Sequence, residues 1–218
     1  MRSVVLLKTP VGWQHAVLVA PGRLLTHYMS GVDGVSLGND AFMLAENTCA
    51  WVDGTCVTLD PRTCMLGNSK TGFCFIALGQ SVPRSQPLPL PAVEPWPVDV
   101  GEQLSVCVLS TGASSLLARA RAAVVGGMST TRLGGAASSC DGATIRFRAA
   151  AELPSHAFGA PVFNARGEWV GLMCAHARTH RTFHTILPCP GPNLLPTPSI
   201  DWPQHCRRRS GRCGGATE

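Results

Sequence analysis

A proline-rich stretch between residues 81 and 98 constrains the fold of this chain more than any other feature. It reads SVPRSQPLPLPAVEPWPV, and its prolines exclude both a helix and a central strand, because proline lacks the backbone N–H and fixes φ. We expect this stretch to lie extended as a semi-rigid connector. The chain then divides into an N-terminal barrel over 1–80, the connector over 81–98, a C-terminal barrel over 99–190 and a Pro/Arg-rich tail over 191–218.

Both units consist of short apolar runs separated by turn residues, a pattern that indicates β-strands. In the second unit, the run SSLLARARAAVV would also suit a short helix, because its alternation is imperfect. We expect strands near residues 3–8, 13–19, 23–26, 41–45, 56–59 and 73–78 before the connector, and near 104–109, 118–125, 144–149, 161–164, 169–175 and 182–187 after it.

The composition agrees with an all-β chain. The 23 glycines and 17 prolines favour short strands joined by turns, and a hydrophobic share of 45% is enough for a packed core. The predicted fold is all-β, with two packed six-stranded antiparallel β-barrels. The ten cysteines form no CxxC pair, so we expect buried free thiols and no cofactor.

The first apolar run, Val4 to Leu7, is too short for a signal peptide, and no later run could span a bilayer. We therefore expect a chain without a signal peptide or membrane span, located in the cytoplasm or, for a viral protein, in the virion.

The most specific motif begins at Gly159 and reads GAPVFNARGEWVGL. It predicts a strand, a tight turn over residues 164–167 and a second strand. With the segments HAVLVAPGRLLTHYMSGVDG, GFCFIALG and VGEQLSVCVLSTG, in that order along residues 3–188, it resembles the trypsin-like, chymotrypsin-fold proteases. The resemblance is to the high-temperature-requirement group and to the picornavirus-type viral cysteine proteases.

This resemblance assigns catalytic positions to residues that depart from the family pattern. The nucleophile position, immediately before Gly-Ala-Pro, is occupied by Phe158, which has no atom that can attack a carbonyl. The glycine of the oxyanion hole is replaced by His156, and the orienting acid by Gly72. The base position falls on His27 in the viral alignment or on Met29 in the other alignment.

These changes predict a pseudoprotease, a non-enzyme that acts as a protein-binding, structural or assembly module, such as a viral particle component. We expect its partner to be another protein or further copies of the same chain. A first alternative is an active intracellular or viral protease with a rearranged site, in which Ser155 attacks with His27 or His156 as base. A displacement of three residues along a loop is up to about 10 Å, however, which is long for proton transfer.

A second alternative is a zinc- or nucleic-acid-binding module. Cys174 and His176 would point to one face of the strand expected at 169–175, which suits C-x-H ligation of zinc. The tail carries an arginine cluster that accounts for much of the net charge of +5. The rest of the chain is then nearly neutral, so a nucleic-acid partner is not expected. The arginines of the cluster are Arg207, Arg208, Arg209 and Arg212.

Overall fold

The computed structural model describes fifteen stretches of the chain. They are residues 3–9, 12–27, 35–36, 41–43, 48–52, 55–59, 64–68, 73–78, 86–88, 90, 98–110, 129–140, 144–154, 156–176 and 183–189. Every element within these stretches is a β-strand. None of the described residues belongs to a helix that is long and apolar enough to cross a membrane.

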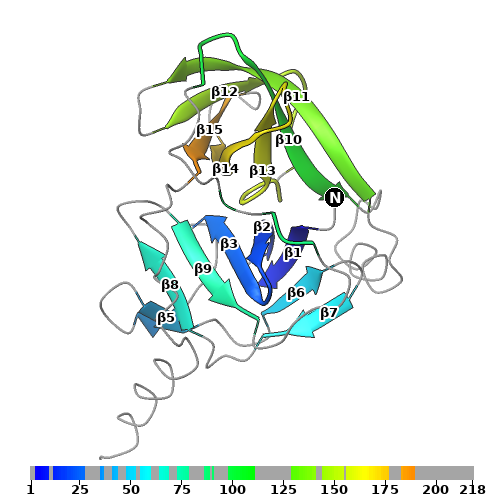
Figure 1. Cartoon of the computed structure of the whole chain (residues 1–218), viewed down its shortest axis with the longest axis vertical. Coiled ribbons are helices and arrows are strands. Elements are labelled where there is room, and N and C mark those ends of the chain that lie inside the picture. The colour runs from blue at the N-terminus through cyan, green and yellow to red at the C-terminus, as the bar shows by residue number, and fades with distance from the viewer. Residues whose placement is uncertain are drawn as a thin grey trace, which may run out of the picture.

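The first half of the chain forms one antiparallel sheet of nine strands (Figure 1). Their order across the sheet is β4-β5-β8-β9-β3-β2-β1-β6-β7. The strands are β1 (Val4–Thr9), β2 (Gly12–Ala20), β3 (Arg23–His27), β4 (Val35–Ser36), β5 (Ala41–Met43), β6 (Cys49–Val52), β7 (Thr55–Thr58), β8 (Cys64–Asn68) and β9 (Phe73–Ala77).

The second half closes into a barrel of six antiparallel strands, which lies above the sheet in Figure 1. The order around the barrel is β10-β11-β12-β15-β14-β13. Its strands are β10 (Gln103–Ser110), β11 (Ser129–Cys140), β12 (Ile145–Ala149), β13 (Pro161–Asn164), β14 (Trp169–His176) and β15 (Phe183–Pro188).

The predicted all-β class with two packed units is confirmed. The first unit differs in detail, because it is a nine-stranded sheet with two edges instead of a six-stranded closed barrel. Four strands were not expected: β4, β6, β8 and β11. The two-residue β4 lies among turn residues, CAWV and CMLGN lack clear alternation, and β11 is rich in small residues. The strand expected at 118–125 lies outside the described residues.

Most residues of β1 and β2 are buried on both faces, which is why the sequence has the apolar runs VVLL and AVLVA there. Val5 and Leu7 point into the interior of the first sheet, together with Leu24 from β3. Val4 and Leu6 point the other way, into an apolar cluster that also contains Leu109 and Phe163 of the barrel and that we call the junction cluster. The two units therefore share a continuous apolar interface.

The connector contributes to this interface. The Leu88 N–H donates to the Leu18 carbonyl at 2.8 Å. The half-buried side chains of Leu88 and Leu90 pack against the junction cluster. The described part of the connector thus covers apolar surface that would otherwise face water.

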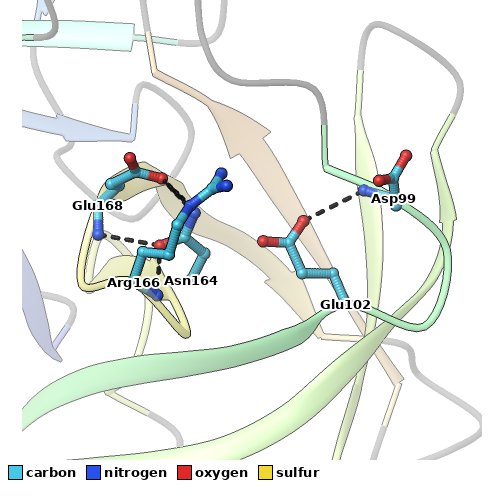
Figure 2. A network of polar contacts seen from close by, with 5 residues as sticks. All are labelled: Asp99, Glu102, Asn164, Arg166 and Glu168. Carbon is cyan, nitrogen blue, oxygen red and sulfur yellow. Dashed lines mark hydrogen bonds and ion pairs between the residues drawn. The ribbon is translucent and has the colours of Figure 1, made fainter.

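The turn between β13 and β14 is built by side chains (Figure 2). Asn164 Oδ1 accepts the N–H groups of Arg166 and Glu168 at 3.1 and 3.0 Å, while Asn164 Nδ2 donates to Glu168 Oε2 at 2.6 Å. The Gly167 N–H donates to the Asn164 carbonyl at 3.0 Å. This tight turn brings β14 back beside β13 directly after the segment that contains Phe158.

Gly159 and Gly167 allow a matched test of packing around this segment. Both have a positive φ, +73° and +80°, but a Cβ at Gly167 would meet nothing within 4 Å. A Cβ at Gly159 would overlap the His15 carbonyl oxygen and lie 2.7 Å from Thr26 Oγ1.

We expect Gly167→Ala to cost about 1 kcal/mol of unfolding free energy, from backbone strain alone. Gly159→Ala should cost upwards of about 3 kcal/mol, because the chain must also move away from β2. Urea unfolding of the two variants measures the difference. Equal losses would show that the close approach of Gly159 to His15 does not occur in solution.

Candidate functional site

The most constrained polar group at the junction is the imidazole of His15, in the middle of β2. It is fully buried, and each of its ring nitrogens has a partner from the second half of the chain. The Leu109 N–H of β10 donates to His15 Nε2 at 2.8 Å. His15 Nδ1 lies 2.6 Å from the His156 carbonyl oxygen.

These two contacts determine the tautomer of His15. A backbone N–H can only donate, so Nε2 must be the unprotonated nitrogen, and Nδ1–H must donate to the His156 carbonyl. Burial lowers the pKa of His15 to about 3, and the positive charge of a protonated His156 would lower it as well. His15 is therefore neutral at physiological pH.

His156 completes a clamp around one residue of the barrel, Leu109. Its ring stacks on the His15 ring, with centroids 5.4 Å apart and an interplanar angle of 20°. His156 Nε2 lies 3.2 Å from the Leu109 carbonyl oxygen and must donate to it, since the carbonyl only accepts. The two histidines thus bind both the N–H and the C=O of Leu109.

The segment around Phe158 inserts where β2 and β3 separate. The last paired residues of these strands at this end are Val17 and Leu25. Beyond that pair, the His15 N–H donates to the Phe158 carbonyl at 2.7 Å, and Thr26 Oγ1 donates to the His15 carbonyl at 2.7 Å. The segment is also held from the barrel side, since the Gly159 N–H donates to the Met173 carbonyl at 2.8 Å.

His27 lies at the same end of β3, directly after Thr26. It is 9% exposed and shares a strand face with Leu25 of the junction cluster. Burial lowers its pKa to about 4. His27 is therefore a neutral imidazole near the Phe158 segment, in the protonation state that a general base requires.

The side chain of Phe158 is half-buried, and its carbonyl oxygen is the acceptor for the His15 N–H described above. A phenyl ring supplies neither a nucleophilic nor a proton-transferring atom. Covalent attack on a substrate requires a residue other than Phe158.

Several predicted site residues lie outside the described part of the chain. They are Met29, Gly72, Ser155 and the tail arginines Arg207, Arg208, Arg209 and Arg212. The roles suggested for them, and the choice between His27 and Met29 as the base position, stay predictions.

The suggested zinc ligands lie on β14. The Cys174 thiol is half-buried, its pKa is raised to about 11 by burial, and it donates to the Thr185 carbonyl at 3.3 Å. His176 is on the same strand, but its side chain is outside the description. The described residues include no group of three potential ligand side chains around one point.

Sequence reasoning missed His15, although it forms the centre of the site. One signal was available, because the run WQHAVLVA places two polar residues, Gln14 and His15, inside an otherwise apolar strand. A buried imidazole needs partners for both nitrogens. The partners lie 94 and 141 residues away along the chain, so the sequence did not identify them.

Comparison with known proteins reveals relatives in structure only. No family model matches this chain, and no curated protein matches it by sequence. Among solved structures, the inactive form of a mutant Rv3671c from M. tuberculosis matches 99% of this chain and 90% of its own, with a TM-score of 0.57 and 13% identity.

Two further matches are a viral protease and a Glu endopeptidase. Tobacco etch virus protease with bound product matches with a TM-score of 0.57 and 13% identity, covering 88% of this chain and 74% of its own. A Glu endopeptidase matches with a TM-score of 0.55 and 10% identity, covering 95% and 91%. The chain therefore has the chymotrypsin-like double-barrel fold of serine and viral cysteine proteases.

The expectation that the chain is not an enzyme is contradicted by these comparisons. The three matches named above are all proteases, and Rv3671c is also matched in its active form, with a TM-score of 0.57 and 15% identity. The inference from Phe158 was too broad. An unreactive residue at position 158 excludes catalysis by that residue, but it does not exclude catalysis by another residue of the chain.

The buried histidines predict a stability that falls in acid. A neutral buried histidine has a lower pKa folded than unfolded, where it is about 6.5. The unfolded chain then binds more protons at moderately acid pH, so the free energy of unfolding decreases as pH falls below about 6.5. Each histidine contributes up to about 1.4 kcal/mol per pH unit, down to about pH 4 for His27 and about pH 3 for His15.

Urea unfolding at pH 7, 6, 5 and 4 measures this slope. His15→Asn, which cannot titrate, should be less stable at pH 7 but lose less stability on acidification. His27→Asn separates the contribution of the second histidine. An unchanged slope in both variants would show that neither imidazole is buried and neutral in the folded chain.

Proposed function

We propose that this chain acts on polypeptides, and that its working surface is the junction between the sheet and the barrel. One observation carries the proposal: the clamp of His15 and His156 on Leu109 holds the Phe158 segment against both units. The proteases with the same fold support it, since polypeptides are the substrates of proteases. An extended polypeptide is the form of ligand that a rigid β-framework binds through backbone hydrogen bonds.

We further propose that hydrolysis, where the chain carries it out, uses His27 as general base and a nucleophile outside the usual position. His27 is suited to the role because it is neutral and directly follows Thr26, whose Oγ1 lies where a Cβ on Gly159 would stand. Ser155 is the candidate nucleophile. Phe158 occupies the position of the nucleophile in the trypsin-like proteases. Catalysis by this chain would therefore require a nucleophile at another position.

A second candidate function is binding of a protein partner, or of another copy of the chain, without cleavage. The observation that favours it is the same phenyl group at position 158. This function requires the junction but neither His27 nor Ser155, so the two candidates make different predictions for variants.

A serine-directed fluorophosphonate probe and a diverse peptide library test the proposal. We expect wild type to be labelled and to cleave peptides, and both activities to fall by at least about 100-fold in Ser155→Ala and His27→Asn. Ser138→Ala, a change to an exposed serine on β11, is the matched control and should leave both unchanged.

The result that would contradict a rearranged protease is a folded wild type with neither labelling nor turnover. Retention of peptides on immobilised wild type in that case supports the second candidate. Absence of both cleavage and peptide retention would overturn the proposal that the chain acts on polypeptides.

A further inference from the structure

Two cysteines lie on the hairpin formed by β6 and β7, at one edge of the nine-stranded sheet. The register pairs Cys49 with Thr58 and Trp51 with Cys56. Residues opposite one another share a face, and so do residues two apart on one strand. Cys49 and Cys56 are therefore diagonal neighbours on one face of the hairpin.

The two thiols are in contact and have access to solvent. Their side chains interact, and Cys56 is exposed while Cys49 is half-buried. Lys8, exposed on the adjacent strand β1, pairs with Cys49, and its positive charge acts on Cys56. The site thus combines two adjacent thiols with a nearby cation, whose effect on the pKa of Cys56 is outweighed by burial and by Cys49.

The other described cysteines have different surroundings. Cys74, Cys107 and Cys189 are buried. The exposed Cys140 donates its thiol to the Val98 carbonyl at 2.9 Å, and Cys174 donates to a backbone carbonyl of β15 as described above. Cys140 is therefore an internal comparison, a thiol with solvent access that donates to a backbone carbonyl.

We propose that Cys49 and Cys56 form a redox-active dithiol site that reacts with low-molecular-weight disulfides and closes into a reversible disulfide. One cysteine thiolate bonds to a sulfur of RSSR and expels RS⁻. The other cysteine, after losing its proton, bonds to the first cysteine sulfur and expels the second RS⁻. The dithiol loses two electrons and two protons, RSSR gains them, and two RSH are released.

The diagonal position of the cysteines makes this disulfide easy to reduce. Diagonal neighbours on paired strands have Cβ atoms about 7 Å apart, whereas an unstrained disulfide brings its Cβ atoms to about 4 Å. Closure must pull the strands together, and strained, exposed disulfides are readily reduced. Trp51 lies opposite Cys56 and belongs to the junction cluster, so its fluorescence should report the closure.

The reaction is tested on the full reduced chain with oxidised glutathione as RSSR. Trypsin releases a peptide from Leu24 to Arg62 that contains Cys49 and Cys56 and no other cysteine. We expect this peptide to lose the mass of two hydrogen atoms, to resist alkylation and to be restored by a thiol reductant. Burial and the neighbouring Cys49 thiol raise the pKa of Cys56 to about 11. The thiolate is the reactive form, so disulfide closure should accelerate as pH rises above neutral.

Variants distinguish bridging from reaction at a single thiol. In Cys49→Ser and in Cys56→Ser, the remaining cysteine should retain a glutathione adduct. A bimane with two alkylating arms, which becomes fluorescent when both arms react, should label wild type and Cys140→Ser, and this labelling should be lost in the two hairpin variants.

Two results would overturn the proposal. One is a stable glutathione adduct on Cys56 of wild type with Cys49 still free. The other is the absence of reaction at both hairpin thiols under conditions in which Cys140 reacts.

Discussion

The burial of one imidazole holds the two halves of this protein in register. A histidine side chain inside an apolar interface is stable only when both ring nitrogens have partners. For His15 these partners are the Leu109 N–H and the His156 carbonyl, from two separate parts of the second half of the chain. The apolar contacts of the junction are non-directional, so these hydrogen bonds select one arrangement of the halves among many of similar burial.

The position of the Phe158 segment follows from this arrangement. His15 donates its own N–H to the Phe158 carbonyl and accepts the Thr26 hydroxyl on its carbonyl, which places Gly159 against the backbone of β2. None of these contacts involves the side chain at position 158. The framework that presents this position is therefore independent of whether the residue there is reactive, and fold and chemistry can change separately.

The same sheet face that forms the junction continues outward to the β6–β7 hairpin. Trp51 packs in the junction cluster, and its opposite neighbour Cys56 is exposed at the edge of the sheet. A chemical change at Cys56 therefore occurs beside Trp51, which is part of the interface between the halves. An edge strand has pairing on one side only, so the hairpin can adjust its twist with less disruption than a central strand.

The sequence alone determined the elements whose signals are local. Alternating or continuous apolar runs predicted most of the strands, and Asn164 to Gly167 predicted the turn between β13 and β14. The sequence did not predict β4, β6, β8 or β11, because β4 is only two residues long and the others carry cysteine, glycine or small polar residues that give weak patterns. The absence of a nucleophile at position 158 is likewise a fact of the sequence.

Tertiary structure decided what the local pattern leaves open. The closure of the second half into a barrel and the nine-stranded form of the first depend on pairing between strands far apart in the chain. The role of His15 depends on partners 94 and 141 residues away, and the contact between Cys49 and Cys56 depends on the hairpin register. The residue type determines which polar groups need a hydrogen-bond partner when they are buried. Only the packed fold brings a particular partner within hydrogen-bonding distance.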